Sequence, residues 1–137
     1  MKKIINLFSF LLMLLGSYPA ISWATPYNIA PQARVSASSS IDAGHDAAKV
    51  TDGLIRVPGK GEWVSKSTET FWGQIDYPWI QLDWERPVNI NKIILYDRPV
   101  MEAHVAGGVL HFSDGSTINV WGMANDGTPK EIEFESR

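Results

Sequence analysis

The sequence predicts an all-β domain, an antiparallel sandwich or barrel of about eight short strands. Apolar and polar residues alternate with a period of two in several short segments, as they do in half-buried strands. Turn-forming pairs such as Asp52-Gly53, Asp114-Gly115 and Asp126-Gly127 separate these segments. Helical periodicity is nearly absent after residue 24, which favours strands over helices throughout the remaining chain.

The first half of the predicted domain holds two strands and two loops. Residues 34–39 alternate small apolar with polar side chains and are expected to form the opening strand. Residues 42–48 are expected to form one helical turn, which Asp42 caps. Residues 62–64 are predicted to be a short strand. The long irregular stretch at 65–78 that follows is expected to be functional, because loops of this length in a compact domain seldom serve only as connections.

The second half holds further short strands, each bounded by turn residues, at 79–84, 90–96, 109–112, 117–121 and 132–134. In the first of them, Ile80 and Leu82 lie on one face and Trp79 lies on the other. The second is the most apolar stretch after residue 24, so it is predicted to be a buried strand. The third and fourth are expected to pair as a hairpin across the turn at 113–116.

The first 24 residues have the three-part pattern of a secretory signal peptide. Lys2 and Lys3 are positive, residues 4–15 form an almost unbroken apolar run, and Ser22-Trp23-Ala24 places small residues where a signal peptidase reads them. The apolar run is shorter than the roughly 20 residues that a membrane span needs. We therefore predict cleavage after Ala24, a secreted or periplasmic mature chain of residues 25–137, and no membrane insertion after cleavage.

Charge and cysteine content limit the function classes. The chain holds 12 basic and 15 acidic residues, and because Lys2 and Lys3 lie in the predicted signal peptide, the mature chain has 10 and 15, a net charge of −5. An acidic surface argues against binding to nucleic acid or anionic membranes. The chain has no cysteine, so the exported domain must be stable by packing alone or with a bound ion. Most of its tryptophans follow residue 24, where they can form core or stack on a ligand.

Several motifs follow one another in a recognisable order, at residues 28–30, 35–39, 49–53, 62–63, 79–84, 93–99 and 112–116. Their order and spacing resemble the discoidin, or coagulation-factor C-type, superfamily, which includes the family 32 carbohydrate-binding modules. The likeness covers about residues 28–137. It implies a galactose-binding-like jelly-roll β-sandwich whose loops at one end hold the ligand. Members bind sugars, membranes or protein partners, so the fold alone does not settle the ligand.

Two features depart from the pattern of that superfamily. Gly61 stands where members often have threonine, two residues before a tryptophan, and the sequence ends at Arg137, before a final strand and glutamate that members usually add. The resemblance therefore predicts a domain that is incomplete at its C-terminus. A missing strand would leave an open sheet edge for a protein partner, or the chain would be a fragment of a larger modular enzyme that acts on glycans.

The resemblance implies a sugar site on the loops at one end of the sandwich. Arg98 matches the arginine that donates hydrogen bonds to ring hydroxyls, Asp97 would orient Arg98, and His104 on the following loop would read further hydroxyls. From residue types alone, Arg98 could equally form a structural ion pair with Asp97 or with another carboxylate. His104 could equally be a solvated surface histidine.

Aromatic residues would complete such a site, because the apolar face of a sugar ring stacks on an aromatic side chain. Trp72, in the 65–78 loop, is the first candidate and Trp79 is the second. The alternative is that Trp72 closes one end of the core. The tryptophans expected on strands are interpreted as core residues, namely Trp63, Trp84 and Trp121.

The resemblance also implies a calcium site around the Asp-Gly turn. The backbone carbonyl of Lys49 and the carboxylate of Asp52 match it, and oxygen atoms are the ligands that calcium prefers. The threonine and the terminal glutamate of that site have no counterpart, so a plain turn without metal is the alternative. No other cofactor is implied, since no cluster of histidine, cysteine and carboxylate residues has zinc-ligand spacing.

Catalytic machinery is not evident in the sequence. There is no Gly-x-Ser-x-Gly elbow, no cysteine and no defensible pair of catalytic carboxylates. We therefore expect an exported, non-enzymatic domain that binds a mono- or oligosaccharide, on a cell surface or in a polysaccharide. A structural or adhesion domain that binds a protein partner is the alternative.

Overall fold

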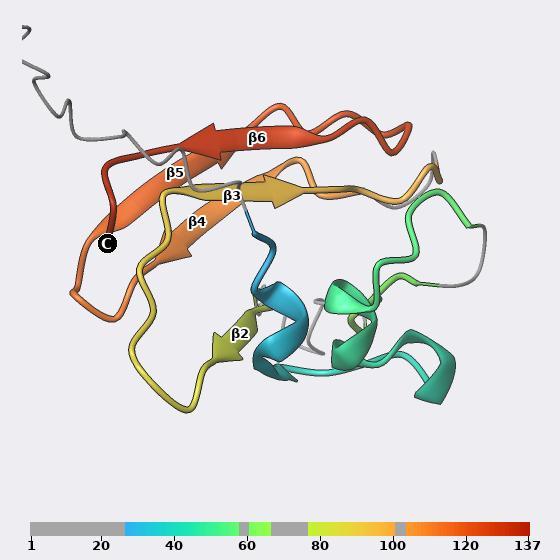
Figure 1. Cartoon of the computed structure of the whole chain (residues 1–137). Helices are drawn as coiled ribbons and strands as arrows, with labels where there is room; N and C mark the ends of the chain where they lie inside the picture. The colour runs from blue at the N-terminus through green and yellow to red at the C-terminus, as the bar shows by residue number, and fades with distance from the viewer. Residues whose placement is uncertain (1–26, 58–60, 67–76, 101–103) are drawn as a thin grey trace, which may run out of the picture.

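The computed structural model describes residues 27–57, 61–66, 77–100 and 104–137. Within these ranges more residues lie in strands than in helices, and the helical elements are all short 3-10 helices, so the predicted β-rich class is confirmed. Six strands form there, fewer than the predicted eight, and they pair as three antiparallel two-stranded ribbons. In Figure 1, β3, β4, β5 and β6 gather in one half of the molecule, and β2 lies with the 3-10 helices in the other half. None of the helices in the described ranges is long and apolar enough to cross a membrane.

The first ribbon joins β1 (Arg34–Ala37) to β2 (Ile80–Asp83). Their register sets Val35 opposite Leu82 and Ala37 opposite Ile80, so the apolar side chains share one face. The predicted alternation of β2 is confirmed, because Ile80 and Leu82 are half-buried and the intervening residues are exposed. Before β1, a 3-10 helix, η1 (Ala30–Gln32), follows Ile29, whose carbonyl accepts a hydrogen bond from the indole of Trp84 at 3.0 Å.

Two further 3-10 helices, η2 (Ala43–His45) and η3 (Ala47–Thr51), follow β1. Oδ1 of Asp42 accepts hydrogen bonds from the backbone N–H groups of Gly44 and His45, at 2.8 and 3.0 Å. This arrangement satisfies N–H groups that have no partner within the helix. The predicted cap at Asp42 is therefore confirmed, but the single turn predicted over 42–48 forms as two 3-10 helices, the second of which Asp46 caps. The predicted turn at Asp52-Gly53 is also confirmed, with Gly53 at a φ of 78°.

The segment predicted as a strand at 62–64 is not one. Instead, Val64 makes two backbone hydrogen bonds to the η2 region, with the N–H of Ile41 at 2.8 Å and the carbonyl of His45 at 3.3 Å. The indole N–H of Trp63 donates to the carbonyl of Ser39 at 2.8 Å, and the side chain is half-buried. Backbone pairing with a 3-10 helix thus replaces the expected ladder.

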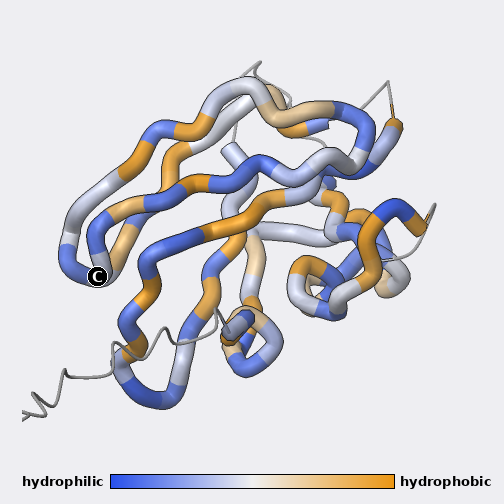
Figure 2. The backbone as a smooth tube through the Cα atoms, turned by 45° about the horizontal axis from the view of Figure 1, so that its top comes forward, coloured by the Kyte–Doolittle hydropathy of each residue, from blue (hydrophilic) through white to orange (hydrophobic). Residues whose placement is uncertain are grey.

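The second ribbon joins β3 (Lys92–Leu95) to β6 (Lys130–Glu133). The strand prediction for 90–96 is correct, but its burial is not. Ile93 and Leu95 are half-buried, whereas Ile94 and Tyr96 are exposed. The segment is apolar on both faces, yet only one face is covered. Figure 2 shows the resulting mixture of hydrophobic and hydrophilic positions along the ribbons.

The third ribbon is the predicted hairpin of β4 (Gly107–His111) and β5 (Thr117–Trp121). Its inner face carries Val120, which is only 4 % exposed and belongs to the core. The outer face carries Trp121, which is 67 % exposed, so its interpretation as a core residue is wrong. The register places Trp121 opposite Gly107, and its ring lies against that glycine on the outer face, away from the core.

Candidate functional site

The loop that follows β3 begins with a buried carboxylate. Asp97 is 7 % exposed, and its Oδ1 accepts a hydrogen bond from the backbone N–H of Arg98 at 2.9 Å. Its Oδ2 accepts a second hydrogen bond, from the backbone N–H of Val105, also at 2.9 Å. Charge-assisted hydrogen bonds of this kind offset the cost of burying the carboxylate. One side chain therefore holds both ends of the 98–105 loop together.

Arg98 extends from this loop to a carboxylate on another segment. Its Nη1 lies 3.7 Å from Oε2 of Glu62, and the two side chains are 21 % and 14 % exposed. Partial removal from water weakens dielectric screening, so this ion pair interacts more strongly than a surface pair does. Of the carboxylates that the sequence left open as partners, the structure places Glu62 beside the guanidinium. Asp97 accepts a hydrogen bond from the backbone N–H of Arg98 and so fixes the point from which the arginine side chain extends.

His104 directly precedes Val105, and its side chain is exposed. Because Asp97 binds the N–H groups of both Arg98 and Val105, the two ends of the loop that carry the predicted sugar-reading residues lie close together. Asp97, Arg98 and His104 therefore lie on one loop, as their positions in the sequence require.

Glu62 is a member of this cluster that sequence reasoning missed. It lies in the short segment 61–66, far from Arg98 in the sequence. In the sequence, Glu62 was marked only by its position directly before Trp63 in one of the motifs. Several other carboxylates were equally plausible partners of Arg98. A half-buried arginine needs a counter-charge, but the sequence does not indicate which acidic residue supplies it.

The predicted aromatic residues are less directly connected to the loop. Trp79 is 51 % exposed and lies just before β2, so the prediction that it faces away from the core is confirmed. Its backbone N–H donates to Oγ of Ser38 at 3.1 Å, and its carbonyl accepts from the N–H of the same serine at 3.0 Å. These contacts place it on the β1–β2 ribbon and not on the 98–105 loop. Trp72 lies outside the described residues.

The two residues of the predicted calcium site lie at and just before the Asp-Gly turn. Oδ1 of Asp52 accepts the backbone N–H of Leu54 at 2.9 Å, and the N–H of Lys49 donates to the carbonyl of Asp46 within η3. Across the described ranges no group of three or more histidine, aspartate or glutamate side chains could hold a metal ion. Calcium takes six to eight oxygen ligands, and these two residues do not provide such a set.

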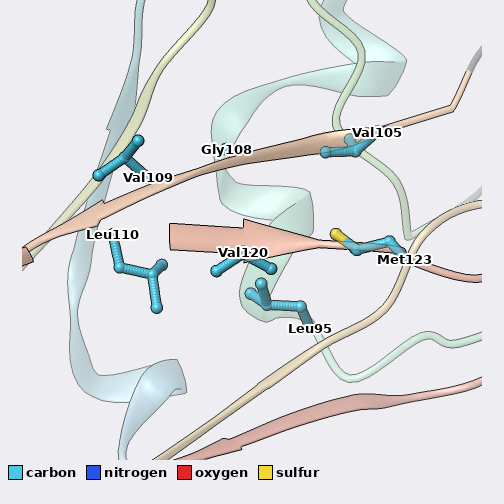
Figure 3. Close-up of a pocket in the computed structure, with 7 residues that line it drawn as sticks. All are labelled: Leu95, Val105, Gly108, Val109, Leu110, Val120 and Met123. Atoms are coloured by element: carbon cyan, nitrogen blue, oxygen red, sulfur yellow. The ribbon is translucent and has the colours of Figure 1, made fainter. Parts of the chain in front are cut away.

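An apolar cavity of about 110 Å³ lies beside the same loop (Figure 3). Its lining shares an aliphatic character and comes from β3, β4, β5 and adjoining residues, namely Leu95, Val105, Gly108, Val109, Leu110, Val120 and Met123. Ligand sites for sugars need convergent polar groups that fix the hydroxyls. A lining without such groups makes this cavity a gap in the packing and not the sugar site.

Comparison with known proteins assigns the chain to a family. Residues 28–137 match the model of a domain of unknown function, DUF7402. The chain belongs to the DUF7402 family. No curated protein matches it, and no solved structure matches it. The family description names no ligand, so the resemblance to the discoidin superfamily stays a prediction.

The DUF7402 match includes every residue of the candidate site, which consists of Glu62, Asp97, Arg98, His104 and Val105. The cluster therefore lies within the family domain and not in an appended segment. The predicted signal peptide at 1–24 precedes the matched region and lies outside the described residues.

Proposed function

We propose that this chain is an exported, non-enzymatic domain that binds carbohydrate through the loop after β3, on a jelly-roll β-sandwich of the galactose-binding type. The observation that carries the proposal is the double hydrogen bond of Asp97, which holds both ends of the loop that bears Arg98 and His104. A ligand site needs its polar groups fixed by surrounding contacts before the ligand arrives. A buried carboxylate that closes the loop meets this requirement.

The chemistry of the cluster suits hydroxyl groups. A sugar hydroxyl both donates and accepts hydrogen bonds. The guanidinium of Arg98 offers several donors in one plane, which matches two neighbouring hydroxyls of a ring. The carboxylate of Glu62, whose Oε2 is buried and lies 3.7 Å from Nη1 of Arg98, holds the guanidinium in place from the protein side. His104 is exposed and supplies either role from the far end of the loop.

In this proposal Trp72 stacks on the apolar face of the sugar ring, and Trp79 is the alternative stacking residue. Binding is weak, because the contacts are few and a sugar is costly to desolvate. Catalysis is not part of the proposal, since no activated nucleophile or acid–base pair is evident in the sequence.

The test is a glycan array followed by calorimetry on the purified protein. We expect at least one mono- or oligosaccharide to bind, and Arg98→Ala to weaken that binding by about tenfold or more, because charged hydrogen bonds contribute about 1.5–3 kcal/mol each. Arg34→Ala, an exposed arginine on β1, is the matched control and should leave binding unchanged. Failure of every glycan to bind, with Arg98→Ala altering only thermal stability, would refute the proposal.

Protein binding is the second candidate function, and a separate observation favours it. Apolar side chains are exposed in η3 and in the segment that follows it, at Val50, Leu54, Ile55 and Val57. Exposed apolar groups that are close together often mark a partner surface. Cross-linking in the cells that export the protein should then capture a partner, and the polar substitution Ile55→Ser should abolish that capture while glycan binding is unaffected. Equal capture of a partner by the wild-type protein and by the Ile55→Ser variant would reject this candidate.

A further inference from the structure

The charges around Arg98 are already balanced by carboxylates. Its guanidinium faces Glu62 at 3.7 Å, and Asp97, 7 % exposed, lies next to it in the chain. Within the described residues of this cluster, one positive and two negative charges leave a net charge of −1. His104 adds a positive charge only when its ring is protonated.

We infer that the loop site takes uncharged sugar rings and excludes anionic ones, such as uronic acids. The inference rests on the proposed function and names the ligand class of that site. To pair with Arg98, a sugar carboxylate would have to displace Glu62 and separate a carboxylate that is only 14 % exposed from the guanidinium that it faces. Separating a partly buried ion pair in this way is costly.

A sugar carboxylate that did not displace Glu62 would lie close to two like charges. In the partly desolvated loop, screening is weaker than in water, so the repulsion is substantial. The mature chain also carries a net charge of −5 if the predicted signal is removed, which disfavours the approach of polyanions. An uncharged hydroxyl meets neither obstacle and can accept a hydrogen bond from the guanidinium of Arg98 while Glu62, whose Oε2 is buried, stays in place.

The test compares methyl glycosides of glucose, galactose and mannose with the methyl glycosides of their uronic acids. Calorimetry is run at about pH 8, where an ordinary histidine is neutral. We expect at least one neutral glycoside to bind, and its uronic acid to bind about tenfold or more weakly. Equal binding of the two forms would overturn the inference and leave the proposed function standing. Absence of binding by either form, and by every glycan on the array, would remove the proposed function and the inference with it.

The substitution Glu62→Gln tests whether the charge of Glu62 causes the preference for neutral over acidic glycosides. Glutamine retains the shape and an acceptor oxygen but removes the negative charge, so the ratio of acidic to neutral affinity should rise about tenfold. Glu131→Gln is the control, because Glu131 pairs with Lys92 on the β3–β6 ribbon, and its ratio should stay at the wild-type value. Circular dichroism confirms that both variants are folded. An unchanged ratio of acidic to neutral affinity in the folded Glu62→Gln variant would refute the role of Glu62. If that variant does not fold, the comparison of glycosides on the wild-type protein still decides the ligand class.

Discussion

Oδ2 of Asp97 lies 2.9 Å from the backbone nitrogen of Val105, eight residues further along the chain, and accepts its hydrogen bond. The other carboxylate oxygen accepts the N–H of Arg98 at the same distance. Because Asp97 is buried, water does not readily replace it as the partner of these N–H groups. The geometry of the candidate site therefore depends on a residue that need not touch the ligand.

Asp97→Ala should destabilise the fold and weaken glycan binding together. Two partly buried N–H groups would lose their acceptor, at a cost of about 1–3 kcal/mol each. Urea unfolding measures the loss in the free energy of unfolding. Asp83→Ala, an exposed aspartate on β2, is the control and should stay within about 0.5 kcal/mol of wild type. A loss no larger than that of the control would show that Asp97 does not hold the loop.

Local features of the fold could be predicted from the sequence because their causes are local. The cap at Asp42 binds N–H groups two and three residues away. The positive φ of Gly53 follows from the turn that contains it. The β4–β5 hairpin follows from two alternating segments joined by a short turn. In each case the residues that decide the structure are neighbours in the chain.

Features that depend on distant contacts could not be predicted. The pairing of Arg98 with Glu62 joins segments that lie far apart in the sequence, and any nearby carboxylate would have satisfied the same charge. The exposure of Trp121 depends on which face of the hairpin is covered, which the alternation of one strand does not reveal. The apolar composition of residues 90–96 suggested burial on both faces, but only tertiary packing decides how many faces are covered.

Asp114 should make the stability of the protein sensitive to acid. Hydrogen bonds from the hydroxyl and then the backbone N–H of Ser116, at 2.5 and 2.8 Å, hold the pKa of Asp114 below its ordinary value of 3.8. Since the folded state favours the ionised form, this stabilisation is present above pH 3.8 and is lost as the pH falls through the lower, folded-state pKa. Asp114→Asn should therefore lower Tm at pH about 7 and differ less from wild type at pH about 3. An equal difference at both pH values would contradict this assignment.

Gly107 should tolerate no side chain, whereas its neighbour Gly108 should. A Cβ at Gly107 would overlap the ring of Trp121 and lie 2.7 Å from the carbonyl oxygen of Val120, which is backbone and cannot move without disturbing β5. Overpacking of this kind costs about 1–3 kcal/mol, so Gly107→Ala should lower the urea midpoint. A Cβ at Gly108 meets no atom within 4 Å, and Gly108→Ala serves as the matched control. Equal stability of the two variants would show that the ring and strand adjust freely.

Arg137 should stabilise the packing of β6 against the turn after β4. Its guanidinium carbon lies 4.9 Å from the ring centre of Phe112 and 5.5 Å from that of Phe134, and these two rings meet edge to face. Arg137→Ala should lower the free energy of unfolding by about 0.5–2 kcal/mol, the range for a cation over an aromatic ring. Arg86→Ala, an exposed arginine between β2 and β3, is the control.

A double-mutant cycle separates this cation–ring contact from the other contacts of Arg137. Its guanidinium also donates to Oγ of Ser116, so truncation alone reports more than one side-chain contact, whereas the two backbone hydrogen bonds with Ile90 remain in the alanine variant. Combining Arg137→Ala with Phe112→Leu removes the ring and the cation together, and the losses should be smaller than additive if the two side chains interact. Strict additivity would mean that the guanidinium lies over the Phe112 ring without stabilising it, and that the effect of Arg137 comes from Phe134 or from the hydrogen bond to Ser116.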